Sequence, residues 1–253
     1  MAFAYSWLAD AFAPPTEAEP KAKAAALKAL ELDPTNADAP YVEFLRALEL
    51  NPSSMEARNF YGLALCAMRQ FDEGLLQTEG AIALDPLSPV SSWTREYCLV
   101  MARRFDETIE QHKKTTELDP NFFYFESPAA IAYREQGMFT EAVAEYQRLQ
   151  KAMGGPRLPG LAVTYARMGK TAEARQILEE FLARSRRQYV SPEQASLIYA
   201  SLGEKDPAFA WLDRSCEARS AFLITGILAL PDYDALRSDP RFDSLLRRIG
   251  LKK

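Results

Sequence analysis

The sequence has few of the residues that enzymes and metal sites use. Among its 253 residues are one histidine, His112, and three widely spaced cysteines, Cys66, Cys98 and Cys216. No CxxC pair occurs, so the sequence indicates neither a disulfide framework nor a zinc site. Reduced thiols are typical of the cytoplasm. We therefore expect no metal, no cofactor and a cytoplasmic location.

Motifs of phosphate-binding and nucleophilic enzymes are also missing. The sequence contains no G-x-x-x-x-G-K-[ST] loop, no G-x-G-x-x-G loop and no G-x-S-x-G nucleophile elbow. A serine–histidine–aspartate arrangement would have to use His112, and no elbow supplies its nucleophile. We interpret His112 as a packed residue and the chain as non-enzymatic.

Basic charge and long apolar runs are equally scarce. The net charge of -5 argues against a nucleic-acid surface, which normally carries a basic stripe. The longest apolar stretch, Ala221 to Leu230, is about half the roughly 20 residues that a bilayer requires. The apolar start lacks basic residues and contains Asp10, so we expect no signal peptide. The sequence predicts neither nucleic acid nor membrane as a partner.

A repeat is the main feature that is present. Copies or near copies of the motif ELDP end at Pro34, Pro52, Pro86 and Pro120, and the last two steps are 34 residues each. A period of 34 residues is the length of a helix–turn–helix unit. Each proline follows a run with helical propensity and helical apolar spacing, where the helix has to stop. The spacing therefore predicts stacked helix pairs.

Other positions recur with the prolines. Counting back from Pro86 and Pro120, and onward along the chain, the recurring residues are Gly62, Leu65, Phe71 and Ala81; Leu99 and Phe105; Tyr133, Gly137, Ala142 and Tyr146; Tyr165, Gly169 and Ala174; and Tyr199, Gly203 and Ala208. Over about residues 2 to 215 this pattern resembles the tetratricopeptide repeat (TPR) family. The resemblance implies an all-α fold: a right-handed superhelical solenoid of about six repeats over 1–215, followed by a capping segment over 216–253.

Two departures from the repeat stand out. Only 18 residues separate Pro34 from Pro52, so the repeat at 35–52 is truncated to a single helix. We expect strain, mobility or domain swapping into a homodimer there. Glu96 occupies a position that is normally small, with Arg95 beside it. Because burial of an unpaired charge is costly, we expect these two side chains to be solvated at a groove edge.

The helix boundaries carry their own signals. The expected N-caps followed by proline are Ser127-Pro128, Ser191-Pro192, Asp206-Pro207 and Asp239-Pro240. Glycine and proline over 154–160 predict a short first helix in the next repeat. The last helix, from Pro240, would cap the solenoid. The tail also resembles repeat regions that follow bacterial Ser/Thr kinases and winged-helix regulators, which implies a bacterial origin.

The resemblance further implies that the first helix of each repeat lines a concave wall. The residues expected there to bind a peptide or partner protein are Asn59, Leu63, Trp93, Tyr97, Tyr124, Ile131 and Arg134. The Lys/Asn/Arg clamp that some members use for terminal carboxylates is not present. Trp93 and Tyr97 are four residues apart and share a helical face. Alternatively, these aromatic residues pack against the neighbouring repeat or against the tail folded into the groove.

Three functions fit the sequence. The first is a protein–protein interaction scaffold that takes a peptide in its groove. The second is a self-assembly module that dimerises through the truncated repeat. The third is the recruitment or sensor region of a larger bacterial regulatory protein.

Overall fold

The computed structural model describes residue 44 and residues 48–122, 126–156, 158–218 and 220–251. Of the truncated repeat predicted over 35–52, only Phe44 and residues 48–52 are described. Tyr124 lies outside the described residues.

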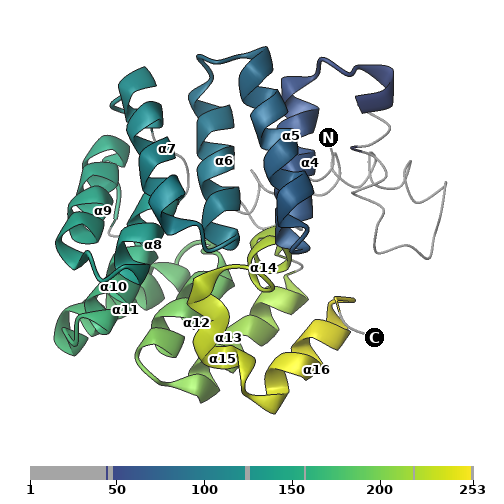
Figure 1. The fold of residues 1–253 in the computed structure, drawn as a ribbon. Helices are drawn as coiled ribbons and strands as arrows, with labels where there is room; N and C mark the ends of the chain where they lie inside the picture. Colours follow the sequence, from purple (N-terminus) through teal and green to yellow (C-terminus); the bar gives the residue numbers. More distant parts are fainter. Residues whose placement is uncertain (1–43, 45–47, 123–125, 157, 219, 252–253) are drawn as a thin grey trace.

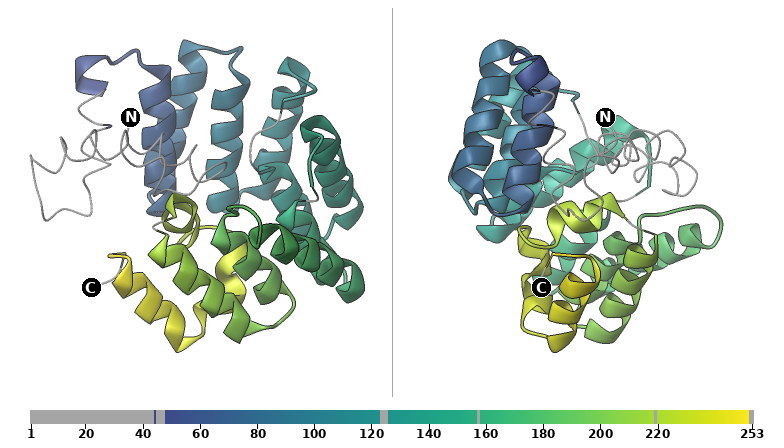
Figure 2. Two further views of the ribbon diagram at one scale, coloured as in Figure 1. Left: turned by 180° about the vertical axis from the view of Figure 1, so that it is seen from behind. Right: turned by 90° about the vertical axis from the view of Figure 1, so that its right-hand side faces the viewer.

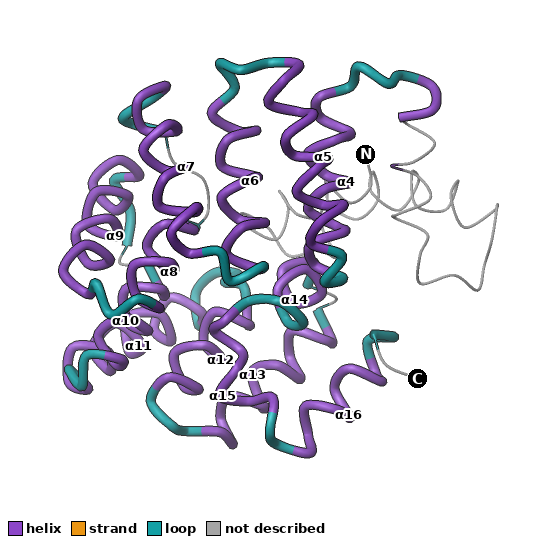
Figure 3. The backbone as a smooth tube through the Cα atoms, in the orientation of Figure 1, coloured by secondary structure: helices purple, strands orange, loops and turns teal. Residues whose placement is uncertain are grey.

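Five antiparallel helix pairs follow one another along the described chain and curve into a superhelix (Figure 1). The pairs are α4 (Met55–Ala67) with α5 (Phe71–Leu84), α6 (Pro89–Met101) with α7 (Phe105–Leu118), α8 (Pro128–Glu135) with α9 (Phe139–Met153), α10 (Pro159–Arg167) with α11 (Thr171–Ser185), and α12 (Pro192–Ser201) with α13 (Lys205–Glu217). The second helices begin 34, 34, 32 and 34 residues apart, as the sequence repeat predicts. The predicted all-α solenoid is confirmed, and the described residues contain no strand (Figure 3).

The same turn joins the two helices of every pair. Its key residue is left-handed, with φ between 62° and 80°: Arg69, Arg103, Gly137, Gly169 and Gly203. In the first turn, the Gln70 amide donates to the Leu65 carbonyl at 2.9 Å and the Arg69 amide donates to Cys66 at 3.0 Å. This pair of hydrogen bonds is a Schellman motif, which favours glycine at the left-handed position. Arginine in the first two turns is therefore strained.

Arg69→Gly is expected to raise the free energy of unfolding by about 0.5 to 1 kcal/mol, because glycine adopts the left-handed conformation without steric cost. Gly137→Ala should lower it by a similar amount, since a Cβ at Gly137 would meet no atom within 4 Å and only backbone strain would act. Thermal unfolding followed by circular dichroism measures both changes. A lower melting temperature for Arg69→Gly would contradict this account.

Small residues let paired helices approach closely. A Cβ on Gly62 of α4 would lie 2.8 Å from the Gly74 carbonyl oxygen of α5, and a Cβ on Gly74 would lie 2.4 Å from the Cys66 sulfur. Ala130, Ala162 and Ser196 occupy the equivalent places in later repeats, and all three are fully buried. The exception is Glu96, which occupies the equivalent place on α6 and is also buried.

The helix caps follow the sequence signals with one exception. The Ser127 and Asp239 side chains accept hydrogen bonds from the first turns of α8 and α16, and α12 begins at Pro192 after Ser191. The predicted cap at Asp206 is wrong: α13 begins at Lys205, after Glu204. Pro207 is tolerated there because amides of the first turn have no intrahelical partner. Helix α10 is short, as predicted, with nine residues.

The chain after α13 forms α14 (Ala221–Gly226), the 3-10 turn η1 (Pro231–Tyr233), α15 (Asp234–Arg237) and α16 (Pro240–Arg248). Helix α16 buries Phe242, Leu245 and Leu246, as expected of a cap. Helix α14 lies against the lower end of α4, while η1 contacts α12 (Figure 2). The last segment therefore reaches from the last repeat back to the first described one.

None of the described helices combines the length and the apolar character that crossing a bilayer requires. In the described part of the chain, no group of three or more His, Cys, Asp or Glu side chains is arranged to hold a metal ion.

Candidate binding groove

The first helices of the repeats, α4, α6, α8, α10 and α12, form the inner wall of the superhelix. The structure places six of the predicted groove residues on these helices: Asn59, Leu63, Trp93, Tyr97, Ile131 and Arg134. All six are buried. The wall is covered, so a partner cannot reach these side chains without a rearrangement.

Among the described residues, the chain from α14 to η1 covers part of this wall. Leu63, Trp93, Tyr97 and Ile131 belong to one buried apolar cluster that the C-terminal segment completes with Leu223, Ile227, Ala229, Leu230 and Tyr233. Tyr97 and Ile131 face Leu230 and Tyr233 across a residual cavity of about 60 Å³. That volume holds a few water molecules and no peptide. The alternative that the tail folds into the groove is therefore the arrangement seen in the structure.

Trp93 and Tyr97 lie together as their spacing predicts. Their rings stack with centroids 5.1 Å apart. The Trp93 indole nitrogen donates to the Glu126 carbonyl oxygen at 3.0 Å, which ties α6 to the chain entering α8. Asn59 lies further along the wall, where its amide nitrogen donates to the Ser91 hydroxyl at 2.9 Å. These contacts join one repeat to the next.

Arg134 is a buried cation on the wall of the groove. Its side chain is 1 % exposed, and its Nη2 donates to Asp232 Oδ1 of η1 at 2.7 Å. The Nε also lies 3.3 Å from a carboxylate oxygen of Glu135. Burial opposes the charge of the guanidinium, but Asp232 and other acidic neighbours raise the pKa of Arg134 above its usual value. Arg134 thus remains a buried cation that requires an anionic partner.

Glu126 adds a titratable group to this wall. Its carboxylate accepts hydrogen bonds from the Tyr146 hydroxyl and the Ser127 amide, both at 3.0 Å. Burial, followed by the nearby charge of Asp232, raises the pKa of Glu126 to about 7. A second acid, Glu193 of α12, lines the same cavity and accepts hydrogen bonds from the Ser215 and Ser220 hydroxyls. The groove therefore combines apolar contacts with one cation and several carboxyl groups.

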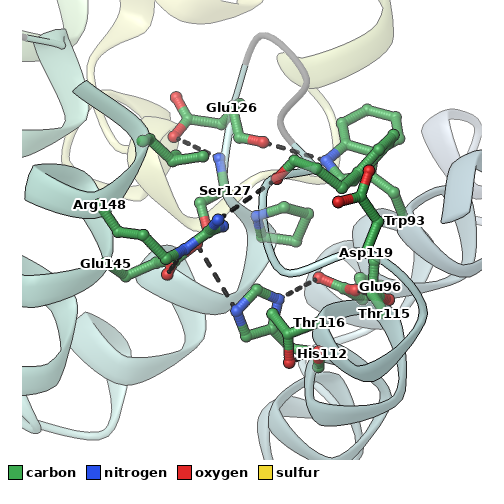
Figure 4. A pocket seen from close by; sticks show the side chains of 13 residues that line it. Trp93, Glu96, His112, Thr115, Thr116, Asp119, Glu126, Ser127, Glu145 and Arg148 are labelled. Atoms are coloured by element: carbon green, nitrogen blue, oxygen red, sulfur yellow. Dashed lines mark hydrogen bonds and ion pairs between the residues drawn. The ribbon is translucent and has the colours of Figure 1, made fainter. Parts of the chain in front are cut away.

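A second cluster lies between α6, α7 and α9 (Figure 4). The prediction that Glu96 is solvated is wrong: its side chain is 1 % exposed. Its Oε2 lies 3.1 Å from His112 Nδ1, and Thr115 donates to its other oxygen. His112 Nε2 lies 3.5 Å from Glu145, and Arg148 donates to both oxygens of Glu145 at 2.8 Å. His112 supplies the cationic partner that offsets the cost of burying the Glu96 carboxylate.

Charge pairing holds this second cluster together. Burial opposes the charge of His112, but Glu145 and Glu96 raise its pKa to about 9, so it is an imidazolium at neutral pH. Both ring nitrogens face carboxylates, and the Ser127 hydroxyl donates to Glu145 rather than to the histidine. The cavity beside them is about 10 Å³, too small for a substrate. The geometry supports the interpretation of His112 as a packed residue.

The sequence did not reveal Asp232 or Glu126 as acidic residues of the groove. Asp232 lies 98 positions after Arg134, and neither residue belongs to a motif that predicts their pairing. Glu126 looks like an ordinary surface acid in the sequence, whereas Glu193 occupies a first-helix position that the resemblance to the TPR family places on the concave wall. The only available signal is the apolar stretch 221–230 before Asp232, which is too apolar for an exposed tail.

No protein-family model matches this sequence, and no protein of known function is significantly similar to it in sequence. Solved structures with a similar fold include YrrB, described as a TPR protein with an unusual peptide-binding site. It shares 13 % identity over 72 % of this chain and 95 % of its own, with a TM-score of 0.43.

The APC/C heterotetramer Cut9–Hcn1 is a second similar structure, with 13 % identity and a TM-score of 0.54 over 91 % of this chain. The match spans 49 % of that chain, so this protein corresponds to about half of its length. Similarity at this level shows a shared fold alone.

Proposed function

We propose that this chain is a non-enzymatic scaffold that binds a partner protein through a segment of that partner laid into the concave groove. The observation that carries the proposal is that the groove already holds a segment that is not a repeat helix. Leu230, Asp232 and Tyr233 contact a wall to which α6, α8, α10 and α12 all contribute. A wall that buries apolar side chains and pairs a carboxylate has the chemistry to bind a peptide.

Four of the predicted wall residues contribute to this mode of binding. Tyr97 and Ile131 supply the apolar floor, and Arg134 supplies the charge. Trp93 supports Tyr97 by stacking on it. Aromatic and arginine side chains in desolvated pockets are the residue types that dominate binding energy at interfaces. A partner gains access when the C-terminal segment moves aside.

Site-specific photo-crosslinking tests this function in the intact chain. A benzoylphenylalanine in place of the half-buried Gln194, which lines the groove on α12, should capture a partner protein in the source cells. The same group in place of Glu179, on the exposed surface of α11, is the matched control and should not capture that protein. Equal capture at both positions, or capture at Glu179 alone, would contradict a groove-binding scaffold.

A further inference from the structure

The ion pair that holds the C-terminal segment in the groove is incomplete. Arg134 Nη2 meets Asp232 Oδ1 at 2.7 Å, while Arg134 Nη1 and Asp232 Oδ2 are buried and, among the described residues, have no hydrogen-bond partner. Arginine and carboxylate groups frequently pair through two parallel hydrogen bonds, which gives them both added energy and a defined geometry. An unsatisfied buried donor and acceptor both cost free energy. The pairing within the chain is therefore poorer than the one that a freely positioned carboxylate can make.

The segment that carries Asp232 is also short and irregular. It consists of the turn over 227–230 and the three-residue η1, between the six-residue α14 and the four-residue α15. Helix α16 has a further contact with α13, because Arg241 pairs with Asp206 at 2.8 Å, although its apolar face shares one buried cluster with Leu230 and Tyr233. The ion pair thus gives the capping helix an anchor that does not depend on residues 230–233.

The charge around Arg134 limits what can replace Asp232. A ligand without a carboxylate would leave Arg134 buried with only the 3.3 Å contact to Glu135. A ligand with several carboxylates would be repelled by Glu126 and Glu193 in the same cavity. A ligand with one acidic residue among apolar neighbours would bring the groove the same charge that Asp232 brings in the structure.

We propose that Leu230–Tyr233 is an internal ligand, and that the partner segment has the same chemistry: an apolar residue, a single aspartate and an aromatic residue in sequence. This inference rests on the proposed groove function and specifies the partner that the groove takes. The partner's aspartate pairs with both Nη atoms of Arg134, and its apolar side chains replace Leu230 and Tyr233 against Tyr97 and Ile131.

Binding of a labelled, C-terminally amidated peptide with the sequence of residues 227–233, which contains Asp232 as its single acidic residue, tests the proposal by fluorescence anisotropy, with the full chain as receptor. Asp232→Asn in the receptor weakens the internal ligand and should tighten peptide binding by about tenfold or more, because the occupied groove reduces apparent affinity by the open fraction. Asp213→Asn is the matched control, since Asp213 lies on α13, pairs with the exposed Arg248 among the described residues, and has a side chain that is 54 % exposed. It should bind as the parent does.

A peptide that itself carries Asp232→Asn should lose most of its affinity for the Asp232→Asn receptor. Equal binding of both peptides, or no gain from Asp232→Asn in the receptor, would overturn the proposal. If the Asp232→Asn receptor does not fold, amide hydrogen exchange on the parent chain tests the proposal instead. Excess peptide should accelerate exchange over residues 228–233, and unchanged exchange there would overturn the proposal. If a partner is crosslinked at Gln194 but its binding does not depend on an aspartate, only the proposed chemistry of the partner segment is refuted. If the peptide binds but no partner is captured, the scaffold function is refuted.

Discussion

Replacement of His112 by alanine is expected to lower the free energy of unfolding by about 3 to 5 kcal/mol at neutral pH. The loss arises because Glu96 would stay buried at 1 % exposure without its cationic partner. Glu145 would keep Arg148, so most of the cost falls on Glu96. Urea unfolding of the parent and variant measures the difference.

The loss of stability caused by His112→Ala should become smaller as the pH rises. The pKa of His112 is raised from 6.5 to about 9 in the folded chain, despite burial, by Glu145 and Glu96. A raised pKa stabilises the fold fully below pH 6.5, and that contribution, about 3 kcal/mol, is lost as the pH rises through 9. The pKa of Glu145 is lowered to about 2 by Arg148 and His112, against burial, so its contribution is present above pH 4.5 and lost towards pH 2.

The difference between parent and His112→Ala should therefore be largest near pH 6 and much smaller at pH 10. Lys113→Ala provides the control, because Lys113 is exposed on the same helix and should change stability little at either pH. A His112→Ala difference that stays constant from pH 6 to 10 would contradict the imidazolium assignment.

Trp93→Ala is expected to lower the free energy of unfolding by about 3 to 5 kcal/mol, the usual cost of removing a buried aromatic side chain. Trp93 is 4 % exposed, stacks on Tyr97 and donates a hydrogen bond to Glu126. The change leaves a cavity and an unpaired carbonyl where α6 meets α8. Thermal or urea unfolding of the full chain measures it.

Trp211→Ala is the matched control for Trp93→Ala. Trp211 of α13 is only partly buried and packs edge-on against Phe181 at a centroid distance of 6.4 Å. Trp211→Ala should lower the free energy of unfolding clearly less than Trp93→Ala does. If the two variants unfold alike, Trp93 is not part of the core that we describe. The comparison also shows why alanine at Trp93 cannot report on binding alone, since it weakens the fold itself.

The sequence predicted the solenoid well because the repeat is a local signal. Turn residues such as Gly137 and the caps Ser127 and Asp239 act on neighbours within a few positions, and the structure confirms them. The environment of Glu96 depends on His112 and Glu145, which come from two other helices. A pattern within one helix shows that a charge is out of place but does not show what pairs with it.

The groove was only partly predictable for a similar reason. The resemblance to the TPR family placed Trp93, Tyr97 and Arg134 on one wall, but the segment that contacts this wall comes from roughly 100 to 140 residues further along the chain. Asp232 has no counterpart in the repeat, so nothing pointed to its pairing with Arg134. Dimerisation through residues 35–52 and the context of a larger bacterial regulator stay predictions.

The contact between α14 and α4 has a consequence for how the chain folds. Repeat arrays usually gain stability from neighbouring units only, so their ends can fray independently of the middle. Here α14 lies roughly 150 residues after α4 in sequence, yet the two helices touch. Such a long-range closure raises the contact order, which slows folding, and couples the first described repeat to the last. The molecule should then lose its structure in one cooperative step rather than repeat by repeat.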